Sequence, residues 1–185
     1  MRRVAVVRTA NLSFELGRFA LPLLLVCAAL GSAAIAKTPG EVMVGGTLRE
    51  APMQGLSGPS QKLSAFRGKP LIINVWASWC GPCLQEMGSL EQLSQTYGGK
   101  QFNVIGISTD DYWTNAKGFL QKTRISFPNF IDNRLLLENM LGADRLPLTL
   151  LVDAQGKVLA KVYGAQSWDG PQALEMIART LRVKL

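Results

Sequence analysis

The chain contains two cysteines whose spacing suits reversible redox chemistry. Cys80 and Cys83 enclose Gly81-Pro82 directly after Trp79. Thiols three residues apart can close a disulfide across the first turn of a helix, and a thiol at a helix N-terminus is stabilised as a thiolate by unpaired backbone N–H groups and the helix dipole. We therefore expect Cys80 to ionise readily and to act as the nucleophile. Cys83, one turn deeper, would resolve the mixed disulfide.

Two other uses of the pair fit the sequence less well. An inert disulfide would give no reason for the pair to lie between a strand and a helix. A zinc site needs more ligands than the chain supplies, because the third cysteine, Cys27, is remote and there is no histidine. The sequence therefore favours a redox pair and predicts no metal.

The residues around the pair predict a strand followed by a helix. Residues 71–76 form a nearly continuous apolar run rich in β-branched and aromatic types, as expected of a strand buried on both faces. Pro82 is tolerated at a first helical position because no intrahelical donor is lost there. Apolar residues then recur at helical spacing up to Tyr97, before Gly98-Gly99 ends the segment: Leu84, Met87, Leu90 and Leu93.

The rest of the chain predicts an α/β domain. The expected elements are a strand at 102–108, helices at 112–123 and 134–141, a hairpin with strands at 148–152 and 157–163, and a helix at 168–183. Residues 47–60 contain proline and glycine and allow only short strands. The order of elements predicts a sheet with parallel and antiparallel parts.

Composition excludes several function classes. A chain of 185 residues holds one domain and a short appendage. Without histidine, His-dependent triads and imidazole bases are excluded. The net charge is +7, but from Lys37 onward 16 basic residues face 12 acidic ones without a dense basic cluster. This pattern favours a solvated surface and predicts no nucleic-acid partner.

The first 36 residues have the layout of an export signal. Arginines precede the uncharged stretch Phe19 to Ala36, and Ala34-Ile35-Ala36 offers a cleavage site before Lys37. We predict cleavage after Ala36. An uncleaved membrane anchor is the alternative, because the stretch is near the lower limit for crossing a hydrocarbon core.

Residues 37–46 are then expected to be a loose leader, and residues 47–185 the folded domain. Cys27 faintly resembles a lipidation site, but Val26 stands where a small residue is expected. A small apolar residue inside the signal is the simpler interpretation.

The cysteine motif resembles that of thioredoxins. Trp79 to Cys83 has the Trp-Cys-Gly-Pro-Cys form, and Leu146-Pro147 precedes a strand as the cis-proline loop of thioredoxin-like folds does. From about Gly46 onward the chain is similar to the TlpA, ResA and CcmG (DsbE) group of membrane-linked or periplasmic thioredoxin-like reductases. The features that carry this likeness are residues 63–70, Asn74 in place of the buried aspartate of thioredoxins, Glu86, and a helical insertion at 110–141.

Two features depart from the group. Met87-Gly88 stands where a nearby proline is common, and Gly81-Pro82 is a thioredoxin-type dipeptide rather than one diagnostic of the cytochrome-maturation branch. The specific pathway is therefore open.

The resemblance implies an α/β, thioredoxin-like fold: a central mixed sheet flanked by helices, with the helical insertion before the cis-proline strand. It also implies an exported thiol:disulfide oxidoreductase that reduces disulfides in periplasmic proteins, such as apocytochrome c or other proteins with metal-binding cysteines. Its partners would be those substrates and a membrane electron donor of the DsbD/CcdA kind, with possible membrane attachment through residues 19–36 and no cofactor.

The implied site comprises two sets of residues. Cys80, Cys83, Pro147 and Glu86 are assigned to catalysis, and Pro147 is expected to be cis and to face the cysteines, since X-Pro bonds are where cis bonds occur. Docking is assigned to Trp79, Gly81, Pro82 and Leu146.

Glu86 has two interpretations. It could accept a proton from Cys83 or modulate its pKa, with its own pKa raised by partial burial. It could instead complement the helix dipole from the first turn.

Two further function classes share parts of this pattern. A peroxiredoxin has the same fold, but its usual threonine or serine three residues before the cysteine is replaced by Ala77. A copper or haem-delivery module could use the cysteines as soft ligands, although no histidine and no adjacent methionine would complete a copper site.

Overall fold

The computed structural model describes residues 39–185, so the export segment, its cleavage site and Cys27 lie outside the described residues. The described part contains a seven-stranded sheet in the order β2-β1-β5-β4-β3-β6-β7. The strands are β1 Pro52–Gly55, β2 Gln61–Lys62, β3 Leu71–Trp76, β4 Asn103–Ser108, β5 Asn129–Ile131, β6 Leu148–Val152 and β7 Val158–Tyr163. The helices are α1 Gly81–Tyr97, α2 Trp113–Thr123, α3 Leu136–Leu141 and α4 Pro171–Leu181, with a 3-10 turn at Leu63–Phe66.

The sheet is mixed around its central strand. β3 pairs with β4 in parallel, with Leu71 opposite Asn103, and with β6 antiparallel, with Leu71 opposite Val152. All six residues of β3 are buried. The continuous apolar run of this strand is explained by helices that cover both faces of the sheet.

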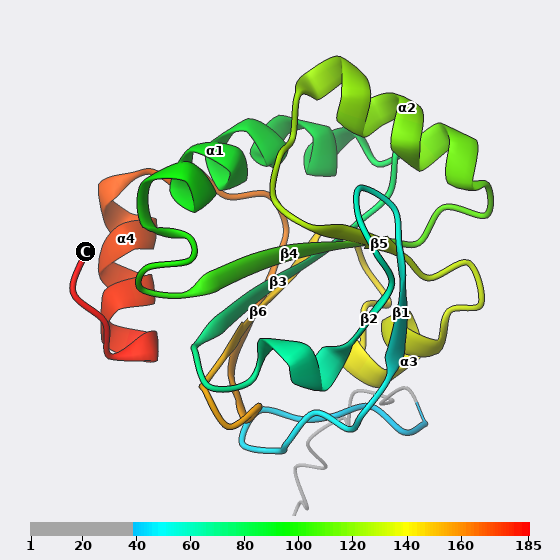
Figure 1. Ribbon diagram of the computed structural model, residues 1–185. Helices are drawn as coiled ribbons and strands as arrows, with labels where there is room; N and C mark the ends of the chain where they lie inside the picture. The colour runs from blue at the N-terminus through cyan, green and yellow to red at the C-terminus, as the bar shows by residue number, and fades with distance from the viewer. Residues whose placement is uncertain (1–38) are drawn as a thin grey trace, which may run out of the picture. The chain divides into compact units, whose positions relative to one another are not determined.

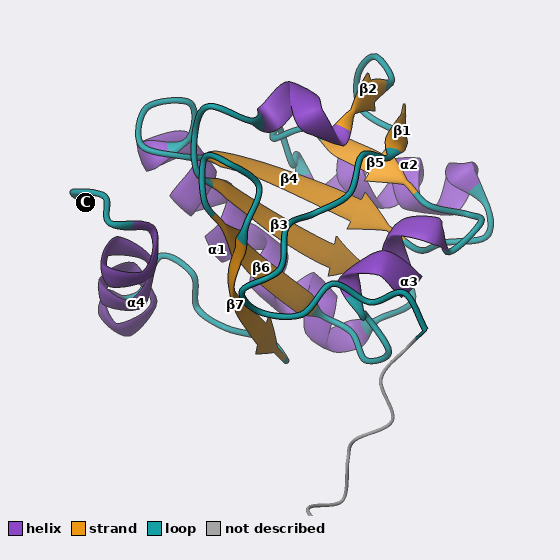
Figure 2. Cartoon of the chain, turned by 90° about the horizontal axis from the view of Figure 1, so that it is seen from below, coloured by secondary structure: helices purple, strands orange, loops and turns teal. Residues whose placement is uncertain are grey.

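Helices α1, α2 and α4 lie on one face of the sheet, while α3 and the 3-10 turn lie on the other (Figures 1 and 2). Successive side chains of β3 alternate between the two cores, so Ile72 and Trp76 pack toward α1 whereas Ile73 and Val75 pack toward α3. Because β3 is clamped between two cores, the turn that follows it starts from a rigid position.

The structure differs from the sequence predictions in the segment before α3. Residues 129–131, inside the stretch expected to be a helical insertion, form the additional strand β5, which pairs with β4 in parallel and with β1 antiparallel. A three-residue strand leaves no periodic signal in the sequence, and its backbone is ordered by its two neighbours.

The last helix begins later than predicted. α4 starts at Pro171, with Gly170 in an extended conformation, so Trp168 precedes the helix. A residue before proline avoids the α region, and proline favours the first helical position.

The end of the expected leader packs on the domain rather than lying loose. Val42 is buried, and its N–H donates to the Met140 carbonyl at 2.8 Å. Gly45 N–H donates to the Val158 carbonyl at 2.8 Å. A glycine-rich segment can still be ordered when its backbone groups find partners on the domain.

Candidate active site

Cys80 and Cys83 form a disulfide where α1 begins. Their Cα atoms are 5.3 Å apart, and Cys80 is the N-cap residue of the helix. The backbone N–H of Cys83 points at Cys80 Sγ, with a donor–acceptor distance of 3.3 Å. Cys80 is 5% exposed and Cys83 is 0% exposed, so only Cys80 is accessible to a substrate.

The turn between β3 and α1 is held by Asp110, a residue that the sequence reasoning missed. Its buried carboxylate accepts from Ser78 N–H at 2.9 Å, from Ser78 Oγ at 2.5 Å and from Ser108 Oγ at 2.7 Å. Asp110 follows the end of β4, the parallel neighbour of β3. The carboxyl ends of parallel strands meet at one edge of the sheet, which is the signal that could have identified it.

Glu86 lies on the buried face of α1, 1% exposed. Its Oε2 accepts from Trp168 Nε1 at 2.9 Å and from Gln166 N–H at 3.0 Å, while Oε1 accepts from Asn74 Nδ2 at 2.7 Å. Burial raises the pKa of this carboxyl, and the hydrogen bonds from Trp168, Gln166 and Asn74 oppose that rise.

The helix-dipole interpretation of Glu86 is wrong. The helix starts at Gly81, so Glu86 lies in its second turn and the first turn contains no acidic residue. The partners of this carboxylate come instead from β3 and from the segment before α4. Asn74, which donates to Glu86, also donates to Thr149 Oγ1 on β6 at 3.0 Å, and its own Oδ1 has no partner in the described residues.

The Leu146-Pro147 peptide bond is cis, which confirms that part of the prediction. Leu146 and Cys80 line the same groove, of about 720 Å³. Pro147 is next to this lining without belonging to it.

The groove lining contains all four predicted docking residues. Its walls are formed by Trp79, Cys80, Gly81, Pro82, Thr109, Asp111, Leu135, Glu138, Ala143, Asp144 and Leu146. Trp79 is 71% exposed, whereas Trp76 is fully buried, as expected of a docking and a packing residue respectively. Asp111, Glu138 and Asp144 were not predicted as site residues.

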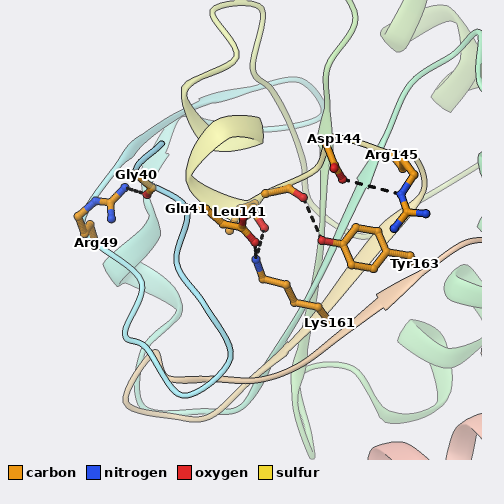
Figure 3. A network of polar contacts seen from close by, with 9 residues as sticks. Gly40, Glu41, Arg49, Leu141, Asp144, Arg145, Lys161 and Tyr163 are labelled. Atoms are coloured by element: carbon orange, nitrogen blue, oxygen red, sulfur yellow. Dashed lines mark hydrogen bonds and ion pairs between the residues drawn. The ribbon is translucent and has the colours of Figure 1, made fainter. Parts of the chain in front are cut away.

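A clamp of polar contacts holds the groove wall that follows α3 (Figure 3). Lys161 Nζ pairs with the Glu41 carboxylate at 2.5 Å and donates to the Leu141 carbonyl at 2.7 Å, and Tyr163 Oη donates to the Gly142 carbonyl at 3.1 Å. These contacts satisfy carbonyls at the end of α3 that lack helical partners. Gly142 has φ +74°, and a Cβ there would collide with the Glu41 carboxyl group. The groove residues Ala143, Asp144 and Leu146 follow directly.

Within residues 39–185, no group of three or more histidine, cysteine or acidic side chains is arranged to hold a metal ion.

Comparisons with known proteins agree with this geometry. The Redoxin family model matches residues 43–177. The thiol-disulfide oxidoreductase ResA of Geobacillus thermodenitrificans is 32% identical over 159 residues, covering 84% of this chain and 91% of the relative. ResA of Bacillus thuringiensis subsp. konkukian is 31% identical over 122 residues, covering 64% of this chain and 70% of the relative.

Solved structures show the same fold. A Chlorobium tepidum structure designated a thiol:disulfide interchange protein DsbE superimposes with a TM-score of 0.69 at 27% identity, covering 76% of this chain and 99% of that one. A secreted disulfide oxidoreductase of Mycobacterium tuberculosis, homologous to DsbE of E. coli, superimposes with a TM-score of 0.60 at 23% identity, covering 70% and 93%.

The fold and the Cys80–Cys83 pair define a thioredoxin-like thiol:disulfide oxidoreductase. The chain belongs to the Redoxin family and, within it, to the TlpA/ResA/CcmG (DsbE) group. These findings confirm the fold class, the family and the enzyme class predicted from the sequence. They favour thiol–disulfide exchange over the peroxidase and metal-delivery alternatives.

Proposed function

We propose that this oxidoreductase is exported and reduces disulfides in periplasmic proteins, such as apocytochrome c or other proteins with metal-binding cysteines. The main observation in support of thiol–disulfide exchange is that a substrate can reach the sulfur of Cys80 but not that of Cys83. Cys80 lines the groove, whereas Cys83 is fully buried behind it. A substrate sulfur reaches Cys80 first, and Cys83 completes the reaction internally.

In the reducing direction, the Cys80 thiolate attacks one sulfur of the substrate disulfide. The substrate S–S bond breaks, a mixed disulfide forms, and the leaving sulfur takes up a proton. Cys83 then loses its proton and attacks Cys80 Sγ, which releases the second substrate thiol and closes the Cys80–Cys83 disulfide. Two electrons pass to the substrate. The Cys83 N–H that points at Cys80 Sγ supports negative charge on the attacking sulfur.

Glu86 is proposed to take up the proton that Cys83 loses. It lies one turn after Cys83 on α1, and its buried carboxylate has a raised pKa, so it binds a proton more readily than a free glutamate does. Pro147 is proposed to shape the groove from the loop opposite α1. Trp79, Gly81, Pro82 and Leu146 would contact the bound segment.

Export is supported by the composition of the N-terminal segment and by one structural neighbour. Residues 1–36 have the composition of a signal or anchor, and one structural neighbour is a secreted protein. No helix within residues 39–185 is long and apolar enough to cross a bilayer. A reductase in an oxidising compartment must be recharged across the membrane, so we propose an electron donor of the DsbD/CcdA kind.

The redox state of the pair in cells tests the direction. Rapid acid quenching followed by alkylation with a mass tag reports how many of Cys80 and Cys83 are free thiols. A mostly reduced pair is expected, and it should become oxidised when the membrane donor is deleted. A pair that is mostly oxidised with the donor present would mean that the enzyme works as an oxidase.

A further inference from the structure

The groove beside Cys80 is acidic although the domain is basic. Residues 39–185 contain 15 basic and 12 acidic side chains, yet the groove walls contain three acidic residues and no basic one. The acidic residues are Asp111 after β4, Glu138 on α3 and Asp144 in the loop before the cis-proline. Carboxylates gathered on the walls of a concave site concentrate their field at its mouth.

These carboxylates are largely unpaired within the described residues. Neither Asp111 nor Glu138 takes part in any of the three ion pairs there. Asp144 has only a weak partner, because Arg145 Nε lies 4.0 Å away with both side chains exposed. The Arg145 guanidinium is also engaged over the Tyr163 ring, at 5.0 Å.

The apolar part of the groove suits long cationic side chains. The Trp79 indole is 71% exposed and Leu135 is 39% exposed, and both line the groove with the carboxylates. Lysine and arginine bury their methylene stems on such surfaces while the charged end stays near acidic or aromatic groups.

We propose that this groove selects substrate disulfides whose cysteine is flanked by lysine or arginine. The inference rests on the proposed function, since a substrate must bring its sulfur to Cys80, the only cysteine in the groove lining. Residues next to that sulfur then face the groove walls, which include Trp79, Asp111, Glu138 and Asp144. A cationic flank finds complementary charge there, and an acidic flank is repelled.

The test uses three short peptides of equal length, each with one cysteine in a mixed disulfide with the same chromophoric thiol. The cysteine is flanked by two lysines, two glutamines or two glutamates. The reduced full chain attacks each peptide, and every rate is divided by the rate with dithiothreitol, which corrects for the effect of charge on the chemistry itself. We expect the lysine peptide to react roughly 3- to 10-fold faster than the glutamine peptide at low salt, with the ratio falling toward one near 1 M salt.

Variants that remove single carboxylates show which groove residues produce the preference for the lysine peptide. Asp111→Asn and Glu138→Gln, singly and together, should lower the lysine-to-glutamine ratio toward one. Glu175→Gln is the matched control, because it removes the same charge from an exposed position on α4 outside the groove lining. Asp111 is an exposed loop residue, so its variant remains informative if Glu138→Gln folds poorly.

The outcomes separate the two proposals. Equal corrected rates for all three peptides, or a lysine preference that survives in the Asp111→Asn/Glu138→Gln variant, overturn the charge selection and leave the exchange activity standing. No reaction with any peptide overturns the proposed function and this inference with it.

Discussion

At the residue scale, Cys80 and Cys83 differ in what can reach them. Cys80 lines the groove and Cys83 is fully buried. Cys83→Ser should therefore accumulate a mixed disulfide between Cys80 and substrate, because the thiol that resolves it is missing. Gel electrophoresis without reductant measures the adduct, and Cys80→Ser is the control that should form none. If alkylation of the reduced wild-type protein near neutral pH modified Cys83 before Cys80, the roles of attacking and resolving thiol would be reversed.

Trp168 donates its indole N–H to the buried carboxylate of Glu86 at 2.9 Å, one of the three hydrogen bonds that this carboxylate accepts. Trp168→Phe removes this donor, so it should lower the free energy of unfolding at neutral pH by about 2 kcal/mol or more, the cost of losing a hydrogen bond to a buried charge. It should also raise the pKa of Glu86 further. Urea unfolding measures the loss, and Trp113→Phe on the surface of α2 is the control, with an expected change below about 1 kcal/mol.

The pH dependence separates the lost hydrogen bond from lost packing. The folded pKa of Glu86 lies above the ordinary value of 4.5, so the stability this group contributes is present below 4.5 and declines as pH rises through the folded pKa. Trp168→Phe raises the pKa of Glu86 further, so its destabilisation should grow as pH rises above the folded pKa of the wild type. A loss that is equal at acidic and neutral pH would show that only packing was affected.

At the element scale, α3 and the groove wall after it are held by the Glu41–Lys161 pair, whose side chains are 11% and 6% exposed. Glu41→Gln leaves Lys161 buried without its counter-charge and should lower the free energy of unfolding by about 3 kcal/mol. Adding Lys161→Met should recover part of the loss, because no lone charge then remains. Urea unfolding of the two single variants and the double variant measures the coupling free energy between Glu41 and Lys161. If the losses of the single variants simply added in the double variant, the two side chains would not be coupled and the prediction would be wrong.

The same clamp should affect substrate use. If Glu41→Gln loosens residues 143–146, kcat/KM for a peptide disulfide should fall several-fold through KM, while a small disulfide that does not fill the groove reacts at the wild-type rate. The exposed pair of Glu175 and Arg179 on α4 provides the control, since Glu175→Gln should change neither quantity. An equal decrease in kcat/KM for both substrates would instead indicate general destabilisation of the domain.

At the scale of the whole molecule, the prediction concerns the first 36 residues. A fusion of residues 1–36 to a reporter active only after export should be active, because arginines precede an uncharged apolar stretch. Leu24→Lys/Leu25→Lys, which places charges in that stretch, should abolish the activity. Mass analysis of the mature chain distinguishes cleavage before Lys37 from an uncleaved anchor. Retention of the unaltered fusion in the cytoplasm would remove both the proposed location and the membrane partner.

Much of the fold could be predicted because its signals are local. The run at Leu71–Trp76, the cysteine pair and the helical spacing up to Tyr97 each involve neighbouring residues, and the observed bounds of β3 and α1 match them within one residue. Predictions failed where neighbours in space decide the backbone. β5 is three residues long and is ordered by β4 and β1, and the end of the leader is ordered by contacts with α3 and β7.

The sequence by itself determined the reaction, since a Cys-Gly-Pro-Cys motif between a strand and a helix needs only local geometry to form a redox pair. Tertiary structure alone decided what surrounds that pair. The bond from Trp168 to Glu86 spans 82 positions and the pair of Lys161 with Glu41 spans 120. The acidic groove likewise joins the loop after β4, α3 and the cis-proline loop. Contacts between such distant residues depend on how the strands order in the sheet, which no local pattern of residue types encodes.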